Sequence, residues 1–136
     1  MTKRLVGLAL GVALFASPVF AERPHIDYTT LTKTSTATTQ QTDAVLWTPA
    51  TGNKFHLQGC LISADLPVKF ELEVSDVDVV PPIYLESNGT VLLGGGENPI
   101  YSSIRDAVLT YSTNRIPVSN QFNNVSVLCW GYESVE

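Results

Sequence analysis

Basic residues are scarce in this chain and form no cluster. The 136 residues include eight Lys and Arg against 13 Asp and Glu. Two of the eight, Lys3 and Arg4, belong to an N-terminal segment that we expect to be removed, which leaves six scattered basic residues and a net charge of −7. Nucleic acids and anionic membranes are bound through clustered Lys and Arg. We therefore expect neither as a partner.

Histidine is almost absent, and this limits catalysis. The chain has only His25, in a polar segment near the start, and His56, which alternates with core residues as a strand-face histidine does. Nucleophilic catalysis needs a nucleophile, a base and an orienting group brought together, and no G-x-S-x-G motif is present. We expect no enzymatic activity, no catalytic residues and no cofactor.

Long hydrophobic runs are missing after the N-terminus. Lys3 and Arg4 precede the apolar run 5–15, which is too short to cross a bilayer, because a crossing takes about 20 apolar residues. Val19 and Ala21 are small residues at the two positions that a signal peptidase inspects. This pattern predicts a secretory leader cleaved after Ala21, no membrane insertion afterwards, and a protein that is secreted, extracellular or on the cell surface.

Only two cysteines are present, Cys60 and Cys129. In an oxidising compartment two thiols on predicted strands favour a disulfide. Such a bond would close a loop of about 69 residues and stabilise the domain by roughly 4 kcal/mol in the chain-entropy model. The alternative is two separate buried thiols that pack as small hydrophobes.

No segment keeps the apolar repeat of a helix over the length of a packed helix, and the chain instead shows the patterns of short strands. The clearest alternation predicts that one set of side chains faces in and the next set faces out: Val68, Phe70, Leu72 and Val74 against Lys69, Glu71, Glu73 and Ser75. In 54–63 the same period puts Phe55, Leu57, Gly59 and Leu61 on one face and His56, Gln58, Cys60 and Ile62 on the other. Asn88-Gly89 predicts a two-residue hairpin turn between strands at 83–85 and 90–93.

These strands predict an all-β fold, a two-sheet antiparallel sandwich that is jelly-roll-like, with seven or eight strands. An immunoglobulin-type sandwich is the alternative, but its Trp between two cysteines is missing, because Trp47 precedes both cysteines and Trp130 follows both. We divide the chain into a signal peptide (1–21), a Thr-rich N-terminal arm or edge strand (22–42) and the β-sandwich domain (43–136).

Three stretches resemble the small jelly-roll domains of bacteriophage virion and tail-associated proteins. They are the turn and strand entry at 46–55 (LWTPATGNKF), the segment 109–112 (LTYS) and the closing strand 124–133 (NVSVLCWGYE). The resemblance covers roughly 44–133 and implies a role in assembly or surface attachment without catalysis. An extracellular filament or cell-surface subunit of similar fold fits the leader better.

The last strand is apolar on both faces, because Leu128, Trp130 and Tyr132 alternate with Val125, Val127 and Cys129. Such a strand is either a central strand covered on both faces or part of a contact. Because apolar surface that no core explains commonly marks association, we favour a subunit or ligand contact at Trp47, Leu128, Trp130 and Tyr132, where the aromatic rings also suit a glycan. For metals, the only candidates are weak calcium ligands at Glu73, Asp76 and Asp78.

We therefore expect a secreted, non-enzymatic structural subunit. It would form a homo-oligomer, a surface layer, fibre or filament, in which the arm at 22–42 adds a strand to a neighbouring subunit. The alternative is an extracellular glycan- or receptor-binding module.

Overall fold

The computed structural model describes residues 28–116 and 124–135, which form strands and connecting loops and contain no helix. Ten strands make two antiparallel sheets, so the prediction of an all-β, two-sheet sandwich is confirmed. The predicted count of seven or eight strands is not confirmed, because short pieces such as β5 and β8 add to the total. The strands are β1 (Leu31–Ala37), β2 (Ala44–Trp47), β3 (Lys54–Ala64), β4 (Val68–Val74), β5 (Val77–Asp78), β6 (Ile83–Leu85), β7 (Gly89–Gly94), β8 (Tyr101–Ser102), β9 (Leu109–Arg115) and β10 (Val125–Ser134).

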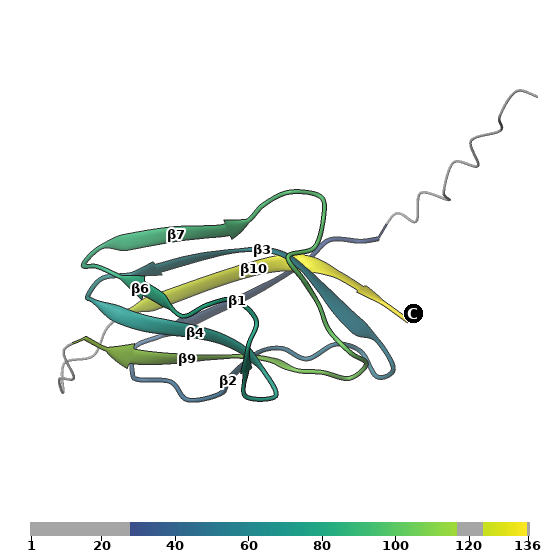
Figure 1. The fold of residues 1–136 in the computed structure, drawn as a ribbon, viewed down its shortest axis with the longest axis horizontal. Helices are drawn as coiled ribbons and strands as arrows, with labels where there is room; N and C mark the ends of the chain where they lie inside the picture. The colour runs from purple at the N-terminus through teal and green to yellow at the C-terminus, as the bar shows by residue number, and fades with distance from the viewer. Residues whose placement is uncertain (1–27, 117–123, 136) are drawn as a thin grey trace, which may run out of the picture.

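Each sheet has five strands, and the sheets stack with their long strands roughly aligned (Figure 1). Sheet A has the order β1-β10-β3-β7, and β8 also pairs with β3. Sheet B has the order β2-β9-β4-β5, and β6 also pairs with β4. β1 therefore lies at one edge of sheet A, and β10 lies between β1 and β3.

The core fills the space between the two sheets. β4 buries Val68, Phe70, Leu72 and Val74 and turns the intervening side chains outward, as the alternation predicts. Phe70 stacks on Tyr111 of β9 with ring centroids 5.6 Å apart. Each such buried side chain contributes about 1.5–3 kcal/mol of transfer free energy, so the aromatic residues supply much of what holds the sheets together.

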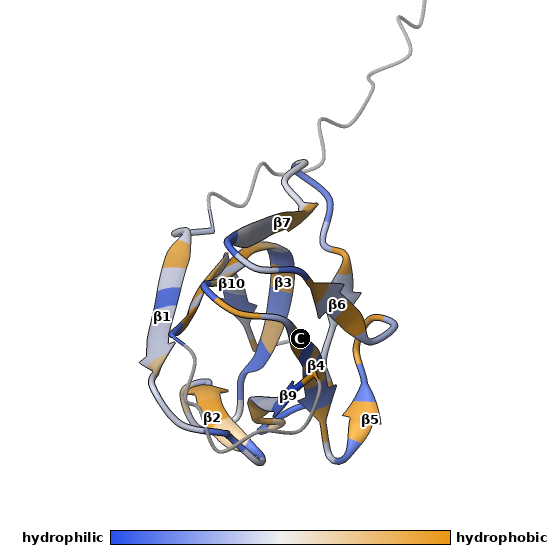
Figure 2. Cartoon of the chain, turned by 90° about the vertical axis from the view of Figure 1, so that its left-hand side faces the viewer, coloured by the Kyte–Doolittle hydropathy of each residue, from blue (hydrophilic) through white to orange (hydrophobic). Residues whose placement is uncertain are grey.

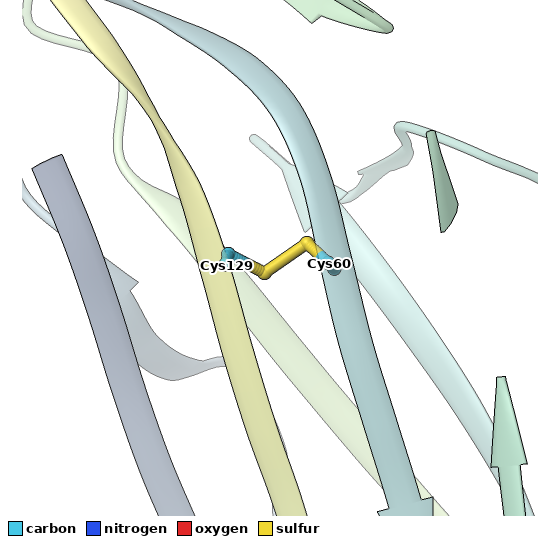
Figure 3. Close-up of a disulfide and its surroundings, with 2 residues drawn as sticks. All are labelled: Cys60 and Cys129. Atoms are coloured by element: carbon cyan, nitrogen blue, oxygen red, sulfur yellow. A yellow bond between two sulfur atoms is a disulfide. The ribbon is translucent and has the colours of Figure 1, made fainter. Parts of the chain in front are cut away.

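The predicted disulfide between Cys60 and Cys129 is confirmed. It joins β3 to β10 within sheet A, at directly opposed positions whose Cα atoms lie 4.0 Å apart (Figure 3). Both cysteines are fully buried. The bond therefore links neighbouring strands of one sheet on the core side and does not bridge the two sheets.

Strict period two in 54–63 is wrong beyond Gln58. Trp130 of β10 pairs with Gly59 and Gly131 pairs with Leu57, so Gln58 is an extra residue on β3 and forms a bulge. The bulge reverses the facing of the rest of the strand. Cys60 and Ile62 consequently point into the core, and Leu61 points outward.

The hairpin predicted at Asn88-Gly89 is also wrong. β6 pairs with β4 in sheet B and β7 pairs with β3 in sheet A, so the segment between them crosses from one sheet to the other. The turn itself exists: Gly89 N donates to Glu86 O at 3.0 Å, and Asn88 has a φ of 54°. A positive φ at Asn88 suits a tight turn and does not specify which strands the turn joins.

The predicted leader at 1–21 and the first part of the arm lie outside the described residues. Across 28–116 and 124–135 the chain has no helix of the length and apolar character that a membrane span requires.

Candidate functional site

The outer face of sheet A carries a row of three exposed leucines across neighbouring strands. Leu128 of β10 pairs with Leu61 of β3, and Leu61 pairs with Leu92 of β7. Their exposed fractions are 37% for Leu128, 42% for Leu61 and 59% for Leu92. We name these residues the leucine row. On the β1 side, Thr34 continues the row opposite Leu128.

Small hydroxyl side chains follow the leucine row on one side. Thr36, Ser126, Ser63 and Thr90 face one another across β1, β10, β3 and β7. A shallow depression of about 270 Å³ lies between these hydroxyls and the leucines. Its lining residues are Thr34, Ser35, Thr36, Leu61, Ser63, Ser126, Val127 and Leu128.

Trp130 follows the leucine row on the other side, and Gly59 fixes its position. A Cβ atom at Gly59 would collide with the Trp130 ring and would lie 2.8 Å from Leu93 O. The ring therefore lies over Gly59, at the point where the bulge begins. Trp130 keeps part of its surface exposed.

An aromatic stack continues the outer face beyond Trp130. The ring of Tyr132 lies between those of Tyr28 and His56, with centroid distances of 4.3 Å and 4.5 Å. Burial, followed by the negative charge that Tyr28 acquires on ionisation, raises the pKa of Tyr132. Because both of its faces are covered, Tyr132 offers no free ring for stacking on a ligand.

His56 is held by two hydroxyls. Its Nδ1 lies 2.8 Å from Ser102 Oγ, and its Nε2 lies 2.8 Å from Ser134 Oγ. Partial burial and the nearby charge of Lys54 lower the pKa of His56. A Ser–His pair of this length occurs in catalytic triads, but there the second nitrogen faces a carboxylate, whereas Ser134 takes that place here. The contacts suit a strand-face histidine that is fixed by its neighbours.

The outward positions of the sheet A strands carry no carboxylate. Among the described strands β1, β3, β7, β8 and β10, the only Lys, Arg, His, Asp or Glu side chains at those positions are Lys54 and His56. In a chain with 13 acidic residues, this face is an exception. It combines exposed apolar side chains with a nearly uncharged surface.

Trp47 does not lie with the other predicted contact residues. It is 0% exposed and stacks on Phe55 in the core, so it is not part of the outer face of sheet A, and we leave it out of the candidate surface. Its Nε1 donates to Glu133 Oε1 at 2.8 Å. Burial opposes ionisation of Glu133, but hydrogen bonds from Trp47, Ala50 and Asn53 outweigh it and lower its pKa.

The weak calcium candidates lie at the β4–β5 turn. Glu73 pairs with Asp78 across the β4–β5 turn, and Asp76 occupies that turn with a φ of 61°. Glu73 Oε2 accepts a hydrogen bond from Ser112 Oγ at 3.1 Å. In the part of the chain that the structure describes, no group of three or more His, Cys, Asp or Glu is arranged to hold a metal ion.

Sequence reasoning placed Leu128, Trp130 and Tyr132 on one face of the last strand, which the structure turns outward, but it did not place Leu61 and Leu92 on that surface. It assigned Leu61 to the same face as Phe55 and Leu57, because the bulge leaves no mark in the apolar pattern. Leu92 lies in an uninterrupted apolar run with Val91 and Leu93, where alternation is not visible. The two glycines on either side of the bulge, Gly59 of β3 and Gly131 of β10, are the one signal that could have located it.

Comparison with protein-family models, with curated proteins and with solved structures finds no match for this chain.

Proposed function

We propose that the chain is an exported, non-enzymatic structural subunit that self-associates into a layer, fibre or filament by donating its N-terminal edge strand to a neighbouring copy. The observation that carries this proposal is the way β1 is attached. β1 runs antiparallel to β10 over Leu31–Ala37 at the edge of sheet A. No strand among the described residues pairs with its other edge.

The side chains that β1 turns inward anchor it weakly. Ala37 is buried and Leu31 is half-buried, but the positions between them hold Lys33 and Ser35. Figure 2 shows the consequence, because β1 is coloured as apolar only at its two ends. The ammonium of Lys33 lies 5.6 Å from the centroid of the Trp47 ring, and Ser35 Oγ lies 2.7 Å from Tyr111 Oη.

An edge strand held in this way is suited to exchange. In a swapped assembly the same backbone ladder and the same two polar contacts form with β10, Trp47 and Tyr111 of a neighbour. The contact energy is therefore nearly unchanged, and domain swapping of an identical element has a low free-energy cost. The unpaired edge is also the type of surface to which a further strand adds.

The strand pairing supports the jelly-roll form of the sandwich. When the eight longest strands are taken in chain order, the first pairs with the last (β1 and β10) and the second with the seventh (β2 and β9). The third then pairs with the sixth (β3 and β7) and the fourth with the fifth (β4 and β6). This nested pairing is that of a long hairpin rolled into two sheets, an architecture shared by capsid and lectin domains.

Export is supported by two features. The N-terminal sequence has the charge and apolar pattern of a secretory leader, and the Cys60–Cys129 disulfide is compatible with an extracellular protein. The resemblance at 46–55 and 124–133 to the jelly-roll domains of phage structural proteins supports a role in assembly or surface attachment and does not bear on export.

A glycan- or receptor-binding module is the second candidate. It is favoured by the partly exposed ring of Trp130, which lies on the same outer face as the hydroxyls and the shallow depression, on the other side of the leucine row. Binding of the protein to a glycan array, lost in Trp130→Ala, would support this candidate.

Strand donation is tested by cysteines placed across the β1–β10 ladder. Thr36 and Ser126 are opposed on the outer face, so Thr36→Cys combined with Ser126→Cys will form a disulfide wherever β1 meets β10. If β1 is donated, oxidised protein runs as a ladder of covalent oligomers on a non-reducing gel. Mixing the two single variants should then give a disulfide-linked heterodimer.

The matched control is Thr36→Cys combined with Thr90→Cys. Thr90 lies in the same row of hydroxyls but on β7, which does not pair with β1, so this pair should give no ladder. If the test pair gives only an internal disulfide while electron microscopy shows assemblies, strand donation is wrong. If the protein stays monomeric at all concentrations, the proposed function itself is wrong.

A further inference from the structure

We propose that the leucine row is an interface at which two copies of this chain meet through the same face of sheet A. This inference rests on the proposed function, since it requires self-association, but it does not require exchange of β1. The face consists of the outward side chains of β1, β10, β3 and β7, with Leu61, Leu92 and Leu128 at its centre.

The shape of the face suits another sheet. Leu128, Leu61 and Leu92 lie at consecutive pairing positions across three strands, so they form one continuous apolar band. The side chains on the hydroxyl side of this band are short. On the other side, the paired residues Gly59 and Gly94 have no side chains, which leaves room beside Trp130. Such a surface lets a second sheet approach to the usual distance of about 10 Å.

The composition of the face favours a second copy over another partner. The chain has a formal net charge of −5, so two copies repel each other over most of their surfaces. The outward positions of the sheet A strands have no carboxylate, and two copies can meet there without bringing acidic groups together. A basic partner would instead be attracted to the acidic residues found elsewhere on the molecule.

The arrangement is also compatible with two-fold symmetry. In an isologous contact each residue must suit a copy of the same surface. A two-fold axis that runs along the leucine row, or that crosses the row at right angles at Leu61, sets leucine against leucine, which satisfies this condition. Exposed apolar surface of this kind commonly marks association in soluble proteins.

The contrast of Leu92→Glu with Val45→Glu tests the interface. Leu92 is 59% exposed on sheet A, and Val45 is 62% exposed on sheet B, so the two substitutions change equally accessible strand positions. Sedimentation equilibrium on the chain without residues 1–21 should show a dimer dissociation constant raised at least about tenfold by Leu92→Glu, the effect of losing one buried leucine contact. Val45→Glu should leave it within about twofold.

Two further measurements separate the possible failures. Thermal unfolding of both variants checks that the fold is kept, and Leu92→Gln should give a smaller loss of association than Leu92→Glu because it adds no charge. If the parent chain associates but both glutamate variants associate as well as it does, the interface is wrong and the proposed function stands. If the parent chain does not associate at all, both are wrong. Loss of glycan binding in Leu92→Glu, with association unchanged, would also overturn the interface.

Discussion

The outer faces of the two sheets differ in what they expose. On sheet B, β4 turns Lys69, Glu71 and Glu73 outward, with an ion pair between Lys69 and Glu71. Its exposed apolar residues, such as Val45 and Tyr84, are separated by these charges and by polar residues of β9. On sheet A the exposed leucines are contiguous and the strands carry no outward carboxylate. The same sandwich therefore presents one face suited to water and one suited to a partner.

The internal construction of the two sheets differs as well. Sheet A contains the disulfide between β3 and β10, the bulge at Gln58 and the glycines that accommodate it. In sheet B, β4 and β9 pair in regular register from Val68↔Arg115 to Val74↔Leu109. Sheet B has a register irregularity at its edge, between Val45 and Trp47 of β2, whereas in sheet A the irregular pair is the central pair β3–β10, which also carries the covalent link. We infer that the disulfide holds β3 and β10 in register beside the bulge, so that the outer face keeps its pattern.

Removing the disulfide, which sheet A has and the described strands of sheet B lack, should have the largest effect on the free energy of unfolding. Cys60→Ala combined with Cys129→Ala should lower the free energy of unfolding by about 4 kcal/mol, because the bond closes a loop of about 69 residues in the unfolded chain. Urea unfolding with and without reductant measures the loss. Parent protein treated with reductant is the control and should lose a similar amount. A loss below about 1 kcal/mol would show that the bond contributes little to sheet A.

Filling the space at Gly59 should have the next largest effect. Gly59→Ala places a methyl group against the Trp130 ring and near Leu93 O, so we expect a loss of about 1–3 kcal/mol from overpacking. Gly96→Ala is the control, since a Cβ there meets nothing within 4 Å, and it should change stability by less than about 0.5 kcal/mol. Tryptophan fluorescence should also shift in Gly59→Ala alone. Equal effects of the two variants would contradict the close packing of Trp130.

The bulge also marks the limit of what the sequence could predict. β4 is half-buried along its whole length, so its alternation of Val, Phe and Leu with charged residues was sufficient to predict both its structure and its facing. The disulfide followed from two cysteines in a chain whose N-terminal sequence predicts a secretory leader. Both predictions depend on local or compositional signals, and the structure agrees with both.

The remaining features depend on contacts between distant segments. The bulge at Gln58 exists because β10 pairs with β3 on both sides of it, and nothing near Gln58 in the sequence records that pairing. Likewise, Asn88 favours a tight turn, but only the separate pairing of β6 and β7 decides that the turn crosses between sheets. For this reason Leu128 and Trp130 could be predicted as a surface, whereas Leu61 and Leu92 could not.

The smallest expected effect concerns His56, on the outer face of sheet A, whose protonation should make the stability of the protein depend on pH. Partial burial and the charge of Lys54 lower the pKa of His56 below its ordinary value of 6.5, so the folded protein binds a proton less readily than the unfolded chain does. The contribution of neutral His56 to the free energy of unfolding is therefore complete above about pH 6.5. This contribution is lost as the pH falls through the lower pKa that His56 has in the folded protein. Urea midpoints at pH 7.5 and pH 5.5 should show a modest decrease in the parent protein.

His56→Gln shows whether that decrease belongs to sheet A. Glutamine keeps one donor and one acceptor for Ser102 and Ser134 but does not titrate, so the variant should have nearly equal midpoints at the two pH values. Glu133, whose pKa lies below its ordinary value of 4.5, loses its stabilising effect only in more acidic solution, which keeps the two groups apart. An undiminished decrease in His56→Gln would assign the pH dependence to another group. The ring of His56 stacks on Tyr132, beyond Trp130 on the outer face of sheet A. Its protonation would therefore also add positive charge to the face that carries the leucine row, and two copies meeting there should separate more readily at pH 5.5 than at pH 7.5.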